Sequence, residues 1–456
     1  MSHRSAPDTV RYALTGAAGD YGRTLLAQRA PGIQPRVLCD IDTAAVRGLL
    51  TELQVPAARI VDADTPEAIA NAAQDPDAII IVPSIDLLPH ASYDILVEAT
   101  GRPEAGFDAA AHAVQGERHV TLVSKEIDSF AGVHLAHLAA SQGTVVTPAL
   151  GDQPANLIEW TDRLRAYGLD IIAIGKSSEY DLIFDPETET VTQLDETIAV
   201  PGFGDLQHLG DDLTATLAAR AEAVAALKRT ATADSCEMAV VSNYTGFTSA
   251  APEMLYPVVR PSELADVYAL REHGGILPEP GHLDVFSALR LPGETSFAGG
   301  VFAIVRTGDP RTWEILRGKG HVVSRDGRTA CLFLPYHLMG VETPVTLTEA
   351  VRHGRAVTPH LPTQVSVLAG RTTRAFSAGE SFVMGGHHHD VEGVAPVVLA
   401  IDDAPTDIAP LYLAGMSSLD ADLPAGTLIT LDRLTGCPTA LLDAWQQSRR
   451  AGSRTH

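Results

Sequence analysis

The fold is decided by a stretch that reads Arg11-Tyr-Ala-Leu-Thr15, then Gly16-Ala-Ala-Gly19-Asp-Tyr-Gly22, then Arg23-Thr-Leu-Leu-Ala-Gln28. Residues 11–15 are a short run of β type, and residues 23–28 read as a helix. A glycine-rich turn therefore joins a strand to a helix. This is the arrangement with which a Rossmann domain binds the diphosphate of a dinucleotide.

Each glycine of this turn has an expected task. Ala17 stands where the G-x-G-x-x-G pattern has its first glycine, so the sequence departs from the pattern there. Gly16, the residue before it, can make the tight turn instead. Gly19 would let the backbone approach a pyrophosphate, and Gly22 would permit close packing of the helix on the strand. The helix start would offer N–H groups and a positive dipole end to the phosphates. The predicted cofactor-binding residues of the turn are Gly16, Gly19, Asp20, Tyr21 and Gly22.

An acidic residue follows at the expected place. Val37-Leu-Cys-Asp40 reads as a second strand and ends 18 residues past Gly22. A carboxylate there would accept hydrogen bonds from the adenosine ribose and would repel a 2′-phosphate. No Arg follows at once, so the cofactor is expected to be NAD or NADP, with NAD favoured. The alternative is a tight turn in another kind of α/β domain, with Asp40 as a helix cap.

Strands and helices continue to alternate, which predicts a doubly wound parallel sheet over residues 9–150. The expected strands are 78–82, 95–99, 119–123 and 144–147, with helices at 105–115 and 135–142. Ligands bind at the carboxyl ends of such strands. Gly101 and Lys125 follow two of them, so we expect Gly101 at the cofactor and Lys125 near the reacting groups.

Composition limits the classes of partner. The formal charge of −24 argues against nucleic acid and against an anionic membrane as partners. The four cysteines have no C-x-x-C spacing, the first residues are polar without an apolar signal region, and no apolar run is long enough for a membrane span. We therefore expect a cytoplasmic protein that acts on a small polar molecule. A homo-oligomer is expected as well.

The rest of the chain predicts two further segments. Residues 151–355 contain apolar strands at 169–174 and 301–305, an Ala-rich helix at 213–227, and a strand pair around Asp326-Gly327. A mostly antiparallel sheet covered by helices, an α+β substrate domain, fits this order. Residues 356–440 contain a weak repeat, Arg374–Glu380 and Asp422–Thr427, and predict a small β-rich domain. Residues 441–456 are expected to be a flexible tail.

Two stretches resemble homoserine dehydrogenase. They are Val97-Glu-Ala-Thr-Gly101 and Gly116-Glu-Arg-His-Val-Thr-Leu-Val-Ser-Lys125. Lys125 matches that family's active-site lysine, which the resemblance places near the nicotinamide and the substrate.

Later stretches resemble a narrower group, the homoserine dehydrogenase-like oxidoreductases with a C-terminal SAF domain. This group includes the 1-deoxy-D-xylulose 5-phosphate reductoisomerase-like proteins. The stretches are 171–176, 237–246, 335–344 and 365–434. The resemblance implies a SAF-like domain at 356–440. It also implies an oxidoreductase that can be a sugar-phosphate reductoisomerase, a class that usually uses a divalent metal. Ala233 departs from the group, because a lysine is expected there.

Four side chains are the predicted polar machinery. Transfer of a hydride needs a group that gives or takes the hydroxyl proton, and a lysine of lowered pKa can do so. Lys125 is the first candidate and Lys176 the second, with solvated surface or loop lysines as the alternatives. Asp234 and Glu237 are expected to orient Lys176 or to bond substrate hydroxyls, although Asp234 is equally explained as a helix N-cap.

Histidines supply two weaker hypotheses. His337 is a proton donor or an anion ligand, or a structural histidine bonded to backbone, which we favour. The run His387-His388-His389-Asp390 suggests a metal, but adjacent residues do not easily converge on one ion. No metal ligands are predicted, and a divalent metal would have only Asp234 and Glu237 as clustered carboxylates. The alternative to an enzyme is a non-catalytic NAD(P) sensor or SAF-type binding protein, which Ala233 favours.

Overall fold

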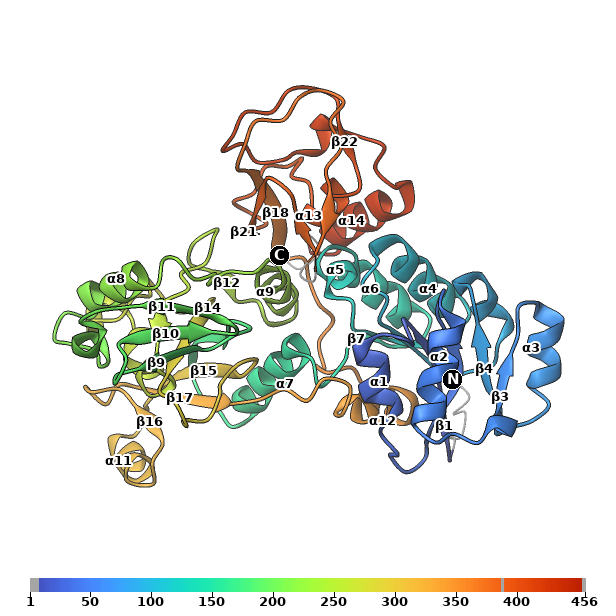
Figure 1. Ribbon diagram of the computed structural model, residues 1–456, viewed down its shortest axis with the longest axis horizontal. Coiled ribbons are helices and arrows are strands. Elements are labelled where there is room, and N and C mark those ends of the chain that lie inside the picture. The colour runs from blue at the N-terminus through green and yellow to red at the C-terminus, as the bar shows by residue number, and fades with distance from the viewer. Residues whose placement is uncertain (1–7, 387–388, 453–456) are drawn as a thin grey trace. The chain divides into compact units, whose positions relative to one another are not determined.

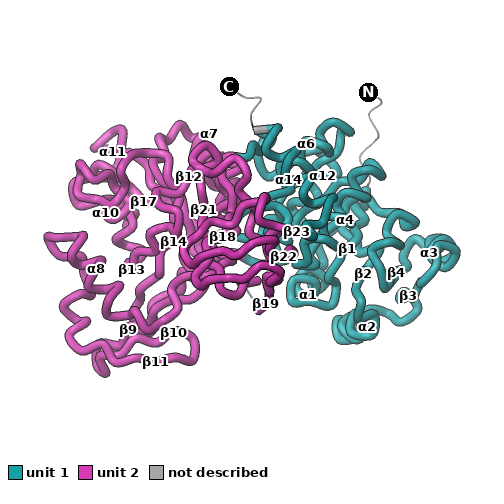
Figure 2. Tube along the Cα trace, turned by 90° about the horizontal axis from the view of Figure 1, so that it is seen from above, with its two compact units in different colours: residues 1–155, 338–364, 436–456 teal, residues 156–337, 365–435 magenta. Residues whose placement is uncertain are grey.

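The computed structural model describes residues 8–386 and 389–452. Contacts within the chain divide it into two compact units (Figure 2). Unit 1 comprises Met1–Ala155, Leu338–Gln364 and Gly436–His456, and unit 2 comprises Asn156–His337 and Val365–Thr435. In the described part of the chain, no helix has the length and the apolar character that crossing a membrane requires.

Unit 1 contains a parallel sheet of seven strands in the order β3-β4-β2-β1-β5-β6-β7. The strands are β1 (Val10–Thr15), β2 (Ile33–Cys39), β3 (Ile60–Asp62), β4 (Ile79–Val82), β5 (Ile95–Glu98), β6 (His119–Leu122) and β7 (Val146–Pro148). The chain runs outward from β1 to β3, then returns to β5 on the other side of β1. The predicted doubly wound Rossmann sheet is confirmed, and the reversal between β1 and β5 is the point at which such sheets bind ligands.

Helices cover this sheet (Figure 1). They are α1 (Asp20–Leu26), α2 (Thr43–Glu52), α3 (Pro66–Ala72), α4 (Pro103–Gln115), α6 (Val133–Ser141) and α12 (Thr343–His353). Tyr21 and Leu25 of α1 share one apolar core with Leu14 of β1 and with Leu347 and Ala350 of α12. A helix from late in the chain therefore completes the N-terminal sheet.

The expected flexible tail is instead a helix, α14 (Thr439–Gly452). Leu441, Ala444, Trp445 and Ser448 are buried in it, and the hydroxyl of Ser448 accepts a hydrogen bond from the backbone N–H of His134. The spacing of these positions is that of one helix face. The prediction is wrong over residues 441–452, because Leu441, Ala444 and Trp445 form a buried face. The polar residues Asp443, Gln446 and Arg450 are exposed.

Unit 2 is built on a mixed sheet in the order β11-β10-β9-β14-β8-β15-β17-β16. Its strands are β8 (Ile171–Ser177), β9 (Leu182–Asp185), β10 (Thr190–Gln193), β11 (Glu196–Ala199), β14 (His282–Arg290), β15 (Val301–Arg306), β16 (Val322–Val323) and β17 (Thr329–Leu334). β14 runs parallel to β8 and β9, whereas the outer pairs are antiparallel. The sheet is thus more mixed than expected. The predicted hairpin at Asp326-Gly327 is present, with Gly327 at φ +74.

Helices and short strands complete unit 2. They include α8 (Leu213–Ala223), α9 (Thr232–Thr245), α11 (Pro310–Gly318), β18 (Ser366–Thr372) and β21 (Val394–Ala400), while α7 (Gln153–Ala166) spans the boundary between the units. The two copies of the weak repeat pair with each other, because Phe376 and Leu423 exchange two backbone hydrogen bonds of 2.9 Å. Each copy then turns at a glycine of positive φ, Gly379 or Gly426. The predicted small β-rich segment is confirmed.

Candidate functional site

In the glycine turn of unit 1, Gly16 and Gly22 are required for close packing of the backbone, whereas Gly19 leaves space for a ligand. A Cβ on Gly16, which has φ +64, would lie 2.2 Å from the carbonyl oxygen of Ala99, and one on Gly22 would lie 2.5 Å from that of Ala17. Both glycines are therefore required by the protein's own backbone. Gly19 has φ −75, and its Cβ would meet nothing closer than 3.4 Å. The space beside Gly19 thus fits a group from outside, such as a diphosphate.

Asp40 ties this turn to the second strand. Its carboxylate accepts hydrogen bonds from the backbone N–H of Ala18, at 2.9 Å, and from that of Asp42, at 3.0 Å. The cap of α2 is Asp42, which accepts from Ala45 N–H, so the helix-cap alternative for Asp40 is wrong. Each carboxylate oxygen can accept a second bond. Asp40 is half-buried, and ribose hydroxyls can still reach it.

Two predicted cofactor-binding residues sit on the first turn of α1. Asp20 is exposed, whereas Tyr21 is only 8% exposed and its hydroxyl bonds that of Thr343. The ring of Tyr21 therefore packs into unit 1. Only its backbone N–H is placed to face a phosphate at the helix start.

The turn that follows strand β5 is organised by a buried carboxyl group, that of Glu98. Glu98 ends β5 with 0% exposure and accepts hydrogen bonds from the N–H and hydroxyl of Thr100, at 2.8 and 2.6 Å. Burial raises the pKa of Glu98, although bonds from Ser124 and Thr100 oppose the rise. Gly101, at φ +62, donates its N–H to the hydroxyl of Ser124. Glu98 closes the turn that holds Gly101, a role that no motif in the sequence indicates.

Lys125 is the first residue of a short helix, α5 (Lys125–Ile127), directly after β6. Its Nζ lies 3.9 Å from a carboxylate oxygen of Asp152, and its side chain is 24% exposed. It is neither a fully solvated surface lysine nor a buried one. It stands at the carboxyl edge of the unit 1 sheet, the edge on which the glycine turn also lies.

Unit 2 brings three of the predicted residues together. Lys176 belongs to strand β8, and Asp234 and Glu237 stand one helical turn apart on α9 and so share a face. The ammonium of Lys176 donates to Asp234 at 2.7 Å and also to Glu237. All three side chains are at most 4% exposed. The solvated-loop alternative for Lys176 is wrong, and so is the N-cap alternative for Asp234, because Ala231 caps α9.

The charges of this cluster set its protonation. Burial alone would lower the pKa of Lys176, but the charges of Asp234 and Glu237 outweigh burial and hold that pKa above its ordinary value. Lys176 is thus a fixed ammonium, not the lysine of lowered pKa that the sequence analysis expected. Burial raises the pKa of Asp234, Lys176 opposes this rise, and the charge of Glu237 adds to it. Asp234 is therefore the member best suited to hold and release a proton.

The cluster opens on a small cavity through Asp234. The cavity has a volume of about 150 Å³, and its walls include Ser178, Glu179, Lys228 and Arg229. The phenol of Tyr256 lies 3.4 Å from the second carboxylate oxygen of Asp234. Lys228, Arg229 and Tyr256 were not predicted as site residues, since no motif marks them and only the fold places them beside Asp234.

The cluster does not fit a divalent metal. The two carboxylates converge on the ammonium of Lys176, which lies where a cation ligated by both would have to lie. Within residues 8–386 and 389–452, no group of three or more His, Cys, Asp or Glu side chains is placed to hold a metal ion. The positive charge at this site is supplied by the chain itself.

The two histidine hypotheses concern His337 and the run from His387 to Asp390. The ring Nδ1 of His337 is buried without a hydrogen-bond partner in the described part of the chain, so the favoured backbone-bonded histidine is not found. His387 and His388 lie outside the described residues. Asp390 accepts a hydrogen bond from the hydroxyl of Thr232 and pairs with Lys228 at 3.5 Å.

Comparison with known proteins gives one family match. Residues 151–343 match the family model described as oxidoreductase DRL, catalytic domain. This segment contains Lys176, Asp234, Glu237 and the cavity beside them. The match supports an oxidoreductase. No curated protein matches the chain.

Solved structures show only partial likeness. A DOX-P reductoisomerase in complex with NADPH, fosmidomycin and magnesium aligns at 15% identity and a TM-score of 0.32, over 52% of this chain and 59% of that one. The oxidoreductase yvaA from Bacillus subtilis aligns at 14% identity and 0.36, over 77% and 91%. A dipicolinate-bound dihydrodipicolinate reductase from Paenisporosarcina sp. TG-14 aligns at 12% and 0.33, over 76% and 97%. Scores this low support no conclusion about cofactor or substrate.

Proposed function

We propose that the chain is an NAD(P)-dependent oxidoreductase that acts on a small polar hydroxy or keto compound. The observation that carries this proposal is the buried cluster of Lys176, Asp234 and Glu237, which opens on a polar cavity inside the matched segment. Buried charges are costly, and their concentration at a cavity is typical of catalytic sites. The glycine turn of unit 1 supports the cofactor part of the proposal.

The chain's own residues have distinct tasks in this reaction. The nicotinamide, when bound, supplies or accepts the hydride. Asp234 gives a proton to the developing alkoxide during reduction and takes it back during oxidation. The fixed charge of Lys176 stabilises negative charge on the substrate oxygen. Glu237 positions Lys176, and Lys125 remains the proposed polar group of unit 1.

The lining of the cavity supports a small polar substrate. Its volume of about 150 Å³ is small, and its charged walls are two cations, Lys228 and Arg229, and four carboxylates, Glu179, Asp195, Glu196 and Asp234. Hydroxyl groups of a substrate would bond the carboxylates, and a single anionic group would pair with the two cations. A reductoisomerase step on a sugar phosphate, which the resemblance implies, is the finer form of the proposal. Reductoisomerases usually use a divalent metal, and the cluster does not fit one. This favours hydride transfer without rearrangement of the carbon skeleton over the reductoisomerase form.

A second candidate function is a non-catalytic NAD(P) sensor or a SAF-type binding protein. Ala233 favours it, because the resembling group carries a lysine there. The missing lysine at position 233 is a weak argument for a sensor, because Lys176 of β8 already supplies a buried ammonium. That ammonium contacts Asp234, the residue next to Ala233 on α9. For the cofactor we propose NAD over NADP, because the carboxylate of Asp40 would repel a 2′-phosphate.

The experiment that tests the enzyme against the sensor is a screen of hydroxy acids, polyols and sugar phosphates, followed by the absorbance of reduced nicotinamide. At least one compound is expected to give turnover. Lys125→Ala is expected to lower that turnover by about 10²–10⁴-fold with nearly unchanged cofactor affinity. Full turnover in Lys125→Ala would remove Lys125 from the machinery. A wild-type protein that binds the dinucleotide but turns over no compound would favour the sensor.

A further inference from the structure

A second cavity of unit 2 is lined by arginines. Residues 306–328 carry six Lys or Arg against three Asp or Glu, in a chain of formal charge −24. Arg306, Arg317 and Arg328 from this stretch line a cavity of about 380 Å³. They come from the end of β15, from α11 and from the turn before β17. Guanidinium groups that gather from three elements around one cavity attract an anion.

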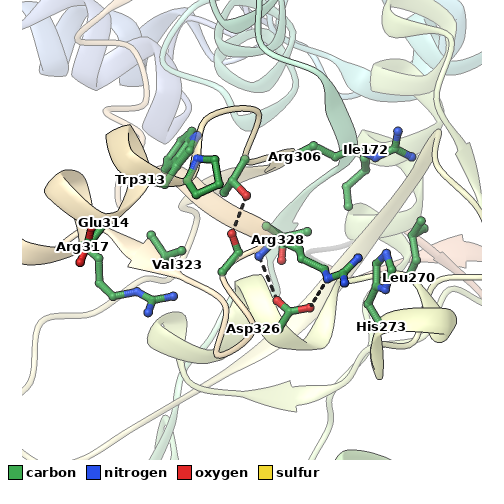
Figure 3. A pocket seen from close by; sticks show the side chains of 14 residues that line it. Ile172, Leu270, His273, Arg306, Trp313, Glu314, Arg317, Val323, Asp326 and Arg328 are labelled. Carbon is green, nitrogen blue, oxygen red and sulfur yellow. Dashed lines mark hydrogen bonds and ion pairs between the residues drawn. The ribbon is translucent and has the colours of Figure 1, made fainter.

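The cavity also has apolar walls. Ile172, Leu270, Pro310, Trp313 and Val323 line it beside the arginines and His273. Figure 3 shows the guanidinium of Arg328 between Asp326 and His273, with Trp313 and Arg317 on the opposite wall. An occupant that matches both kinds of wall carries an anionic group and an apolar part.

The arginines are held in place and keep donors for a ligand. Arg317 donates to the carbonyl oxygen of Ser324, Arg306 pairs with Asp170 at 3.3 Å, and Arg328 pairs with Asp326 at 3.5 Å. A guanidinium has five N–H donors, so one such contact leaves others for a phosphate or carboxylate. Two carboxylates, Asp326 and Glu314, also line the cavity. Asp326 is already bonded by the hydroxyl of Ser324 and the N–H of Arg328.

This cavity is separate from the buried cluster. Ile172 lies near the start of β8 and Lys176 lies four residues later, a distance of about 13 Å along a strand. On the neighbouring strand β15, Val301 pairs with Lys176 while Arg306 is at the far end. A ligand in this cavity therefore does not occupy the proposed substrate cavity.

We propose that this arginine-lined cavity is a second binding site, for a small organic anion whose phosphate or carboxylate group bonds the arginines and whose apolar part packs against Trp313, Leu270 and Val323. The proposal does not depend on the proposed oxidoreductase activity. The distinction between its ligand and the substrate rests on the proposed function, because that function places the substrate beside Asp234.

Titrations of the full chain with phenylphosphate and with benzoate test the proposal, read by tryptophan fluorescence and by calorimetry. We expect saturable binding that weakens with salt and a fluorescence change that Trp313→Phe removes while calorimetric binding remains. Arg317→Ala and Arg328→Ala are each expected to weaken binding about tenfold or more. Arg311→Ala is the matched control, because Arg311 lies on the same helix, is 78% exposed and does not line the cavity. The comparison of the two probes tells phosphate from carboxylate.

Any one of the following results would overturn the proposal. The first is the absence of saturable binding of either probe to a folded protein. The second is equal weakening in Arg311→Ala and Arg317→Ala, which would indicate general surface charge. The third is salt-sensitive self-association of the chain that Arg317→Ala and Arg328→Ala abolish, which would make this surface an interface between two copies. Inorganic phosphate that binds as tightly as phenylphosphate would remove the role of the apolar walls.

Discussion

Replacement of Lys176 by Met is expected to lower the free energy of unfolding at pH 8 by about 3–5 kcal/mol, the cost of a buried ion pair that loses one partner. Met keeps the length of the side chain, so the lost ammonium dominates. Asp234 and Glu237 would then be two buried carboxylates with no cation between them. Denaturant unfolding measures the change, and Lys228→Met, at a side chain 62% exposed, is the control that should change little.

The same variant tests the electrostatic account of the cluster through pH. Loss of the ammonium raises the carboxylate pKa values in the folded state, and a raised folded-state pKa gives stability that is present at low pH and is lost as pH rises. The defect of Lys176→Met should therefore be smaller at pH 5 than at pH 8. A pH-independent defect would show that packing, and not charge, explains it.

Metal binding is expected to appear in Lys176→Ala, whose short side chain vacates the point between the two carboxylates. Two convergent carboxylates suit Mg²⁺ or Mn²⁺, which prefer oxygen ligands. Lys176→Ala should be stabilised against heat by either ion, whereas the wild type should not respond, because its own ammonium lies at that point. Equal stabilisation of the wild type would contradict the role of Lys176 as the built-in cation.

Asp234→Asn is expected to lower turnover by about 10²–10⁴-fold, the usual contribution of a positioned proton donor or acceptor. An amide keeps the shape of the carboxyl group but cannot transfer its proton. Dinucleotide affinity should change little, since the proposed contacts of the dinucleotide are with the glycine turn and Asp40, whereas Asp234 is proposed to act on the substrate. Steady-state kinetics with the substrate found by the screen measure the effect.

The pH profile supplies the control for Asp234. Burial raises its pKa, so the protonated acid persists to higher pH than for an ordinary aspartate. The rate of reduction should fall as pH rises through that value, and the Asn variant should lose this dependence. A variant with the wild-type pH profile would assign the proton transfer to another group.

The sequence predicted the local parts of this account. The alternation of strands and helices predicted the unit 1 sheet, and glycine spacing predicted which residues pack closely. The spacing of Asp234 and Glu237 places them on one face once residues 232–245 form a helix. Their pairing with Lys176 on β8, and the cavity wall of Lys228 and Arg229, depend on tertiary packing. Local patterns carry no information about such contacts.

Gly19 is the residue on which the cofactor claim can be measured most directly, by calorimetric titration of wild type and Gly19→Ala with NADH and NADPH. The account predicts that the wild type binds NADH more tightly than NADPH. It also predicts that Gly19→Ala keeps its thermal midpoint, because its backbone suits alanine and its Cβ has room, yet loses about tenfold or more in affinity. A folded wild type with no affinity for either dinucleotide, or an alanine variant with undiminished affinity, would contradict it.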